Sequence, residues 1–440
     1  MQPLDAIERC FQGVIPAYLA TCSPEGEPNV TAISIVHRLA DDRIGVSCQF
    51  MNKSLRNLRE NALAQVAVLD PVTLCEFLLD LAFEKLHEHG PVFDRMSAQL
   101  DAVASQTGMH GTFALAGVAE LRVLDWRKVG DEEGTPTEER PATDPMRALE
   151  RVSAAMAEAA DLSTLFETTF AVLDTVLGLH HGFLLLADES GERLYNVASL
   201  GFDRAHVGAE IAFGDGLYGT AAARRMALRN GSMRRERLLL LAVARESEQA
   251  RPTDLPLPGL PDVESSIAVP LVRGERCLGV LCFQSRDPGA FDAACERMLT
   301  IVARHLAAMT AVLGTGDADV QLSARRGPAG SRALVTRVKF FESDGSVFVD
   351  DEYLIWGVAG RVLYRVLGNY SAEHRDEFSS KELRLDPTVG LPALKDNLEA
   401  RLIALRNRLE ERAAPFRIQK AGRGRFRLEV SRELLLERLP

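Results

Sequence analysis

Lys53 and Ser54 are the residues best suited to binding a phosphate, within the stretch MNKSLRNLR at positions 51–59. Polar and basic side chains there lead directly into a predicted helix. Free backbone N–H groups at a helix start attract an anion, and a lysine and a hydroxyl beside them add charge and hydrogen bonds. The alternative interpretation is a solvated, arginine-rich first turn, which the spacing also allows.

A second group of candidate binding residues lies near the C-terminus, where positions 395–427 hold 10 basic and 4 acidic residues. The segment 394–412 is predicted to be a helix, because leucines recur at steps of three and four and form one buried stripe. The stripe consists of Leu398, Leu402, Leu405 and Leu409. Arginines then flank the stripe on both sides, and small residues and an amide lie opposite the core. These are Arg401, Arg406 and Arg408, and Ala400, Ala404 and Asn407.

This helix and the hairpin predicted at 416–430 favour binding to double-stranded DNA. Small residues let a helix approach the base edges, and arginines beside them reach phosphates or guanines. The hairpin tip, Gly422-Arg423-Gly424, has charge without bulk, as a minor-groove contact requires. The predicted DNA contacts are Arg401, Arg406, Asn407, Arg408, Arg423 and Arg425. The alternative, a solvated and salt-bridged helix, would not explain the basic hairpin.

Histidine and cysteine patterns predict neither a metal site nor a catalytic centre. His180 and His181 stand at a helix-to-strand junction, where such residues are more often surface or capping residues. His87-Glu88-His89 lacks a third and a fourth ligand. A thiol in an apolar strand is normally inert. We therefore assign no catalytic and no metal-binding residue from the sequence.

Length and composition indicate a modular folded protein. The chain has 440 residues, which predicts roughly two to four domains. Apolar residues at 46% and charged residues at 26% are ordinary values. No apolar run approaches the roughly 18 residues of a membrane span, and the N-terminus lacks the apolar segment of a signal peptide. Seven scattered cysteines suit a reducing compartment, so we expect a cytoplasmic protein with no membrane partner.

Charge and linkers divide the chain into three blocks. The net charge of −11 argues against a protein that coats nucleic acid with its whole surface, although it leaves room for one basic module. Two segments rich in Gly, Pro and polar residues, 130–145 and 314–331, are interpreted as linkers. They separate domains at 1–129, 146–313 and 332–440, and no block repeats the pattern of another.

Each block has its own predicted element order. The first is a small, mainly β barrel, with strands at 14–22, 29–39, 43–50, 64–70, 73–83 and 112–126 and a helix near 92–105. The second has a helix at 144–178, strands at 180–189 and 191–201, a strand pair at 265–285 and a helix at 291–313. The third has a hairpin at 340–355, helices at 358–370, 379–386 and 394–412, and the basic hairpin.

The first block resembles the pyridoxamine 5′-phosphate oxidase-like FMN-binding split barrel over roughly residues 10–128. The resemblance rests on NVTAISIVHRLADDRIGVSCQFMNKSLRNLRENALAQVAVLD, GPVFDRM and GTFALAGVAELRVLDW. It implies a homodimer of six-stranded barrels with flavin mononucleotide (FMN) at the subunit interface. The implied cofactor-binding residues are Lys53, Ser54, Arg56 and Asn57 at the phosphate and Ser47 and Gln49 at the ring edge. No counterpart of the residues that act on the pyridoxal substrate is found.

The other two blocks carry further resemblances. GDGLYGTAA and SSIAVPLVRGERCLGVLCFQS are similar to a GAF domain over roughly 146–313, which implies a pocket for a small-molecule effector of unidentified chemistry. NLEARLIALRNRLEER and RIQKAGRGRFRL resemble the recognition helix and wing of the OmpR/PhoB-type winged-helix domain, over roughly 337–430. No receiver domain with an acidic cluster precedes this block, so phosphorelay control is not expected.

Together these patterns predict a multidomain protein: a mainly β split barrel, an α/β GAF domain and an α+β winged helix. The expected function is a transcriptional regulator in which flavin and effector control DNA binding by a homodimer. The alternative is an FMN-dependent oxidoreductase with regulatory GAF and winged-helix domains, and the sequence leaves enzymatic turnover undecided. The weakness of the oxidoreductase alternative is that no set of acid/base or substrate-binding residues accompanies the predicted flavin site.

Overall fold

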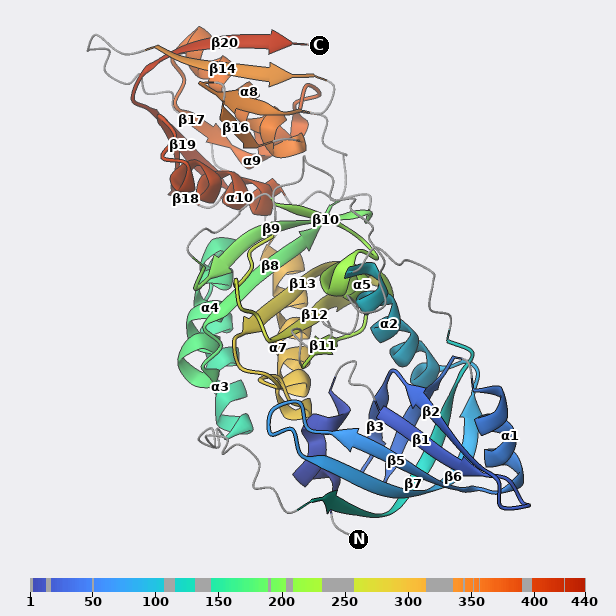
Figure 1. The fold of residues 1–440 in the computed structure, drawn as a ribbon. Helices are drawn as coiled ribbons and strands as arrows, with labels where there is room; N and C mark the ends of the chain where they lie inside the picture. Colours follow the sequence, from blue (N-terminus) through green and yellow to red (C-terminus); the bar gives the residue numbers. More distant parts are fainter. Residues whose placement is uncertain are drawn as a thin grey trace. The chain divides into compact units, whose positions relative to one another are not determined.

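Figure 1 shows the computed structural model of the chain. Contacts between its residues divide it into two compact units. The first is Met1–Leu149, Ala212–Pro252 and Gly259–Ala303, and the second is Glu150–Ile211, Thr253–Pro258 and Arg304–Pro440. The structure describes residues 3–12, 17–49, 51–106, 115–130, 144–188, 191–202, 209–231, 257–313, 335–342, 345–350, 352–355, 357–389, 398–422 and 424–439. Most of both predicted linkers, and Arg423, lie outside these ranges.

Seven strands form the N-terminal sheet, in the order β2-β1-β5-β6-β7-β4-β3. They are β1 (Ala17–Cys22), β2 (Pro28–Ile33), β3 (Val36–Ala40), β4 (Arg43–Cys48), β5 (Leu63–Leu69), β6 (Glu76–His87) and β7 (Gly117–Val129). The prediction of one strand at 29–39 is wrong, because Ser34 and Ile35 separate β2, which pairs with β1, from β3, which pairs with β4. Since these two edge strands are consecutive in the chain, the sheet curls round on itself as a barrel.

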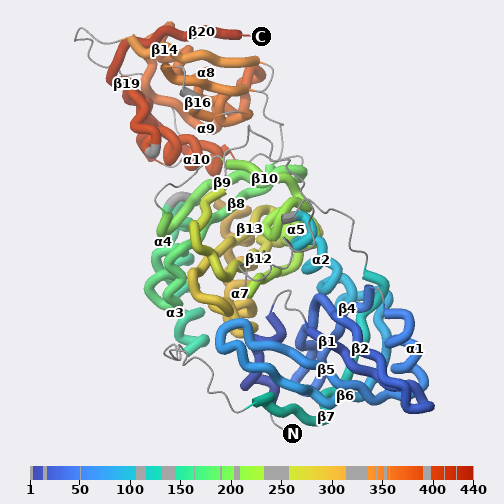
Figure 2. The backbone as a smooth tube through the Cα atoms, viewed as in Figure 1, coloured from blue at the N-terminus to red at the C-terminus, as the bar shows by residue number. Residues whose placement is uncertain are grey.

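Alternating apolar residues fill the barrel, and helices cover it. Leu19, Ile44, Val66, Leu79 and Leu121 are fully buried in one core, and each contributes about 1.5–3 kcal/mol of burial. The covering helices are η1 (Leu4–Phe11), α1 (Asn52–Glu60) and α2 (Pro91–Gln106). α1 lies along β1 and β2, as the trace in Figure 2 shows.

The middle block forms a six-stranded sheet in the order β10-β9-β8-β13-β12-β11. Its strands are β8 (His181–Ala187), β9 (Arg193–Leu200), β10 (Glu210–Ala212), β11 (Leu228–Asn230), β12 (Ser265–Arg273) and β13 (Arg276–Ser285). Its helices are α3 (Pro145–Ala157), α4 (Leu162–Leu177), α5 (Gly216–Arg224) and α7 (Ala293–Leu313). The predicted strand pair at 265–285 is confirmed, with Gly274 at φ +61° in its turn.

The single helix predicted at 144–178 is two helices. α3 ends at Ala157, and α4 begins at Leu162 after Asp161, whose side chain accepts a hydrogen bond from the Thr164 N–H at 3.0 Å. An N-cap of this type stabilises a helix by about 1 kcal/mol. The acidic cap therefore creates a break that the apolar periodicity alone does not reveal.

Among its described residues, the C-terminal block contains two small sheets and three helices. The strands are β14 (Val335–Phe341), β15 (Val347–Val349), β16 (Glu352–Ile355), β17 (Glu377–Ser379), β18 (Phe416–Gly422), β19 (Arg425–Val430) and β20 (Glu433–Leu439). The sheet orders are β16-β15-β14-β20 and β17-β19-β18. The helices are α8 (Gly357–Glu373), α9 (Ser380–Leu385) and α10 (Leu398–Glu411). The predicted order of hairpin, three helices and hairpin is confirmed, and β20, which pairs parallel with β14, is an element the prediction missed.

The leucine stripe predicted for α10 faces the core of this block. Leu398, Leu402, Leu405 and Leu409 are each at most 7% exposed and pack with residues of α8, β18 and β19. No helix among the described residues is long and apolar enough to cross a membrane.

Candidate functional site

The start of α1 offers a positively charged, uncapped helix terminus. Met51 at the N-cap makes no side-chain hydrogen bond to the helix, and the first turn contains no acidic residue. The first N–H groups of a helix have no intrahelical acceptor. Lys53 and Arg56 are exposed beside them, with the Lys53 Nζ 3.9 Å from a carboxylate oxygen of Glu27. This end of α1 can therefore attract an anion.

Ser54 and Asn57 point inward from the same helix. The Ser54 Oγ accepts a hydrogen bond from the Asn29 Nδ2 at 2.8 Å, and the Asn57 Nδ2 donates to the Thr21 Oγ1 at 3.1 Å. Both residues are at most 2% exposed. Their polar groups hold α1 against β1 and β2, which leaves Lys53 and Arg56 as the exposed side chains of the predicted phosphate set.

Ser47 and Gln49 lie at the end of β4. The Ser47 Oγ accepts a hydrogen bond from the Ile35 N–H at 3.1 Å, and this serine is buried. The Gln49 Oε1 accepts from the Ser34 Oγ at 3.2 Å, while its buried Nε2 has no hydrogen-bond partner among the described residues. A buried amide donor without a partner is costly. Together with the cationic helix start, it fits a phosphate-bearing cofactor whose ring carries acceptor atoms, such as FMN.

Polar groups on α5 and β13 form a buried chain in the middle block. The Gln284 Nε2 donates to the Tyr218 hydroxyl at 2.7 Å, and the Gln284 Oε1 accepts from the Leu260 N–H at 2.9 Å. Burial raises the pKa of Tyr218 well above its usual range, so the phenol stays neutral. Burial likewise raises the pKa of the Cys277 thiol to about 11 and that of Cys282 well above its usual value. These two thiols are therefore poor nucleophiles.

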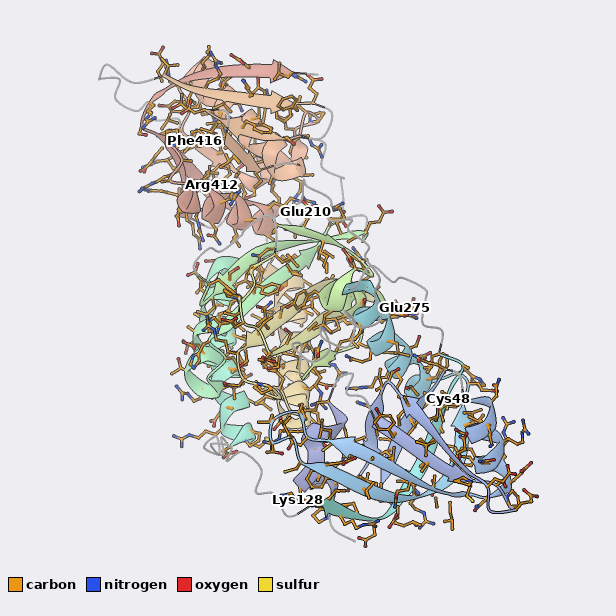
Figure 3. All side chains as sticks on the ribbon, viewed as in Figure 1. Cys48, Lys128, Glu210, Glu275, Arg412 and Phe416 are labelled. Atoms are coloured by element: carbon orange, nitrogen blue, oxygen red, sulfur yellow. The ribbon has the colours of Figure 1, made fainter. Side chains whose placement is uncertain are left out.

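Glu210 stands at the start of β10 (Figure 3). Burial raises the pKa of its carboxyl from 4.5 to about 7, although the positive charges of Arg193 and Arg401 oppose the shift. The Arg193 Nε lies 2.9 Å from a Glu210 carboxylate oxygen. A change of charge here is a candidate signal that the sequence did not reveal.

His180 and His87 each pair with a carboxylate. The His180 Nδ1 lies 2.6 Å from the Asp174 Oδ1, and the His87 Nε2 lies 2.6 Å from the Glu120 Oε2. Within the described ranges, no group of three or more His, Cys, Asp and Glu side chains could hold a metal ion.

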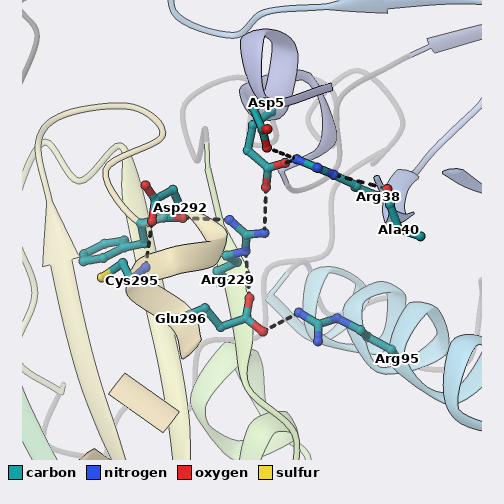
Figure 4. Close-up of polar contacts among 10 residues, drawn as sticks. Asp5, Arg38, Ala40, Arg95, Arg229, Asp292, Cys295 and Glu296 are labelled. Carbon is teal, nitrogen blue, oxygen red and sulfur yellow. Dashed lines mark hydrogen bonds and ion pairs between the residues drawn. The ribbon is translucent and has the colours of Figure 1, made fainter. Parts of the chain in front are cut away.

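A buried ion network within the first unit was missed by sequence reasoning (Figure 4). The Arg229 Nε lies 2.8 Å from the Glu296 Oε2, and Arg229 also lies 3.5 Å from Glu8. Arg95 of α2 pairs with the same Glu296 carboxylate. Arg229 and Glu296 are about one-tenth exposed. No spacing could predict this network, because its members come from η1, α2, β11 and α7.

The predicted DNA-contact residues divide into two groups. Arg408 is 1% exposed, and its Nε donates to the Leu354 carbonyl oxygen at 2.9 Å, so its predicted place beside the outer face is wrong. Ala400 and Ala404 are buried as well, at 0% and 2%, so the face predicted to be outermost is covered in the structure. The physical reason is that α10 packs against α8 and β18 and also against β9 and α4.

Arg401, Arg406, Asn407 and Arg425 lie in the second unit, and Arg423 lies outside the described residues. Arg401, Arg406 and Asn407 are half-buried on α10. Arg425 of β19 lines a cavity of about 70 Å³ together with Arg406 and Lys420. Lys420 is a basic residue of this cavity that the predicted set omitted, although it lies in the same charged hairpin.

Two family models match separate parts of the chain. A model described as pyridoxamine 5′-phosphate oxidase matches residues 4–123, and a GAF domain model matches residues 159–310. The chain therefore carries a pyridoxamine 5′-phosphate oxidase-like domain and a GAF domain. These are the domains that hold the α1 site and the Tyr218–Gln284 pair, respectively. No curated protein matches the chain.

Solved structures resemble single domains of the chain. An FMN-binding protein from Syntrophomonas wolfei subsp. wolfei is 19% identical, with 30% of this chain and 93% of that chain covered and a TM-score of 0.25. The GAF domain of an Acinetobacter phosphoenolpyruvate-protein phosphotransferase is 19% identical, with coverage of 40% and 97% and a TM-score of 0.32. Free methionine-R-sulfoxide reductase from Neisseria meningitidis, solved with its substrate, is 22% identical, with coverage of 40% and 95% and a TM-score of 0.31.

Proposed function

We propose that the protein is a transcriptional regulator in which a flavin-binding barrel and a GAF pocket control a C-terminal winged-helix DNA-binding domain. The observation that carries the proposal is the C-terminal element order. A hairpin, three helices and a basic hairpin succeed one another, with Arg401 and Arg406 on the two flanks of the leucine stripe of α10 and Asn407 opposite it. A helix with such side chains, followed by a basic β-ribbon, is suited to contacting a groove and its phosphates.

FMN is the proposed ligand of the barrel. The cationic start of α1 would hold its phosphate through Lys53 and Arg56, and the unpartnered Gln49 Nε2 would donate to the ring edge. The cofactor would supply redox chemistry, while the chain binds and orients it. The resemblance of the barrel to the pyridoxamine 5′-phosphate oxidase-like family implies that the cofactor would lie at a homodimer interface. Each dimer would then present two DNA-binding modules to two half-sites.

DNA binding is tested with the double variant Arg401→Ala/Arg406→Ala in the full chain. We expect its affinity for duplex DNA to fall about 10- to 100-fold and the slope of log K against log salt to decrease by about two, because two cations leave the phosphates. Arg417→Ala, an exposed arginine on β18 outside the predicted contacts, is the matched control. Unchanged affinity in the double variant refutes the DNA-binding assignment.

Flavin binding is tested separately. We expect Lys53→Ala/Arg56→Ala to weaken FMN binding, measured by flavin fluorescence quenching, while Arg59→Ala at the other end of α1 leaves it unchanged. Equal binding by both variants and the original chain would locate any phosphate site elsewhere.

The family of the N-terminal domain favours one alternative, an FMN-dependent oxidoreductase. Steady NAD(P)H-dependent turnover of a reducible substrate would support the enzyme. Flavin that is reduced once without turnover would support sensing.

A further inference from the structure

Basic and amide groups of the C-terminal domain contact α4 and β9 of the GAF domain. The Asn407 Nδ2 donates a hydrogen bond to the Val197 carbonyl oxygen at 3.2 Å. The Arg401 guanidinium lies over the Tyr195 ring, 5.2 Å from its centroid. Asn407 lies on the side of α10 opposite the leucine stripe, and Arg401 lies on a flank of that stripe.

Acidic residues of α4 complete the contact. The Arg406 Nη2 lies 3.6 Å from the Glu167 Oε1, and the Lys420 ammonium of β18 pairs with Asp161, the N-cap of α4. Two carboxylates thus meet two cations of the helix and hairpin that the proposed function assigns to DNA. The two carboxylates therefore take the place of the DNA phosphates that these cations would otherwise neutralise.

The contact combines charged and apolar side chains and is incompletely filled. A cavity of about 70 Å³ remains between these elements, lined by Asp161, Arg406, Lys420 and Arg425. Interfaces between domains of one chain resemble transient protein–protein interfaces. Exposed ion pairs are individually weak and are screened by salt. The contact is therefore suited to opening and closing reversibly.

We propose that α4 and β9 of the GAF domain form a docking surface that covers the DNA-binding face of the C-terminal domain and holds the chain in a closed, inactive form. This inference rests on the proposed function and adds a mechanism by which DNA binding is regulated. Arg401, Arg406, Asn407 and Lys420 cannot contact DNA while they contact the GAF domain. An effector that binds the open form more tightly than the closed form shifts the equilibrium toward the open form. The size of the shift is set by the ratio of the two affinities.

The test is the double variant Asp161→Asn/Glu167→Gln in the full chain. Asparagine is as good an N-cap as aspartate, so the variant removes both charges and keeps α4 capped. Asp174→Asn is the matched control, since Asp174 is an acidic residue of the same helix that pairs with His180. Two readouts are measured: affinity for a mixed-sequence DNA duplex at low salt, and amide hydrogen exchange of residues 398–411.

We expect the double variant to bind the duplex about tenfold more tightly than the original chain, and to exchange faster in α10, because less of the population is closed. The Asp174→Asn control should match the original chain in both measurements. Equal DNA affinity and equal exchange in the double variant and the original chain overturn the docking proposal.

The two readouts separate this inference from the proposed function. If no form binds DNA but exchange in α10 rises only in the double variant, the docking surface stands and the DNA-binding function fails. If DNA binding depends on Arg401 and Arg406 in the original chain, while the double variant changes neither readout, the function stands and the docking surface fails.

Discussion

Arg408 of α10 donates a hydrogen bond from its Nε to the carbonyl oxygen of Leu354 in β16, 2.9 Å away and inside the C-terminal core. A guanidinium keeps its charge at all ordinary pH values, so its burial is tolerated only with acceptors around it. The side chain therefore joins α10 to the first sheet of the domain. Its role is structural, in contrast to Arg401 and Arg406 on the same helix.

Arg408→Met should lower the free energy of unfolding of the C-terminal domain by about 1–3 kcal/mol. The substitution keeps most of the aliphatic volume but leaves the Leu354 carbonyl oxygen without its buried donor. The measurement is urea unfolding followed by far-ultraviolet circular dichroism. Arg412→Ala is the control, because Arg412 is exposed one turn further along (Figure 3) and should change stability by less than about 0.5 kcal/mol. Equal stability of the two variants would contradict a structural role for Arg408.

Arg229 and Glu296 should be coupled in stability. Removing either charge by Arg229→Met or Glu296→Gln takes away a close opposite charge but leaves Arg95 beside Glu296 and Glu8 beside Arg229, so the cost should lie below the about 3–5 kcal/mol of an isolated buried pair. The double variant should be less destabilised than the sum of the single variants, by about 1–3 kcal/mol. Arg95 also pairs with Glu296, so Arg229→Met should be the milder single change. Strict additivity of the two changes in unfolding free energy would show that the pair does not interact.

Gly219→Ala should destabilise the GAF domain by about 1–3 kcal/mol. A Cβ at this position would lie 2.2 Å from the carbonyl oxygen of Ala212, and the backbone there cannot move aside cheaply. Gly368→Ala is a control for which we expect a change in unfolding free energy of the opposite sign, because no atom lies within 4 Å of a Cβ added at that position in α8. At this half-buried helix position, where an added methyl group has open space, alanine should stabilise by about 0.5–1 kcal/mol. Thermal unfolding of both variants measures the contrast, and a neutral Gly219→Ala would refute the steric argument.

Local patterns predicted most elements of the fold, because strand alternation, helix periodicity and turn residues act over a few neighbouring positions. The leucine stripe of α10 and the strand pair at 265–285 are examples. The prediction of one long helix at 144–178 failed at Asp161, because the side chain of this residue caps a new helix there despite the continuous apolar pattern. β20 was missed because its partner, β14, lies about one hundred residues away in the sequence.

The candidate sites were harder to predict, since a helical wheel describes one helix and not its neighbours. The wheel placed Ala400, Ala404 and Arg408 on or beside an exposed face, but α10 is packed on more than one side. At α1, residue types predict an anion site, which stays a prediction, whereas only the folded structure could show that Ser54 and Asn57 bond to β2 and β1. The Arg229 network depends on four distant segments and left no trace in local sequence.

Glu210 should make stability fall as the pH rises from about 4.5 to about 7. Burial raises the pKa of this carboxyl from 4.5 to about 7; the charges of Arg193 and Arg401 oppose that shift, and Asp188 adds to it. Between these two values the folded chain holds a proton that the unfolded chain has released. The stabilising contribution is therefore complete below the unfolded pKa and is lost as the pH rises through the folded pKa, with a slope of at most about 1.4 kcal/mol per pH unit.

Glu210→Gln removes this titration while keeping a neutral side chain of the same shape. Near pH 4 the variant and the original chain should have similar urea midpoints, because Glu210 is then protonated in both the folded and the unfolded chain. Near pH 8 the variant should be the more stable of the two, since the original chain must bury a charge that glutamine lacks. Glu192→Gln, an exposed residue just before β9, is the control and should leave the pH profile of the original chain unchanged. If the midpoints of Glu210→Gln and the original chain instead run parallel across this range, the Glu210 carboxyl titrates at its ordinary value and is not the source of the pH dependence.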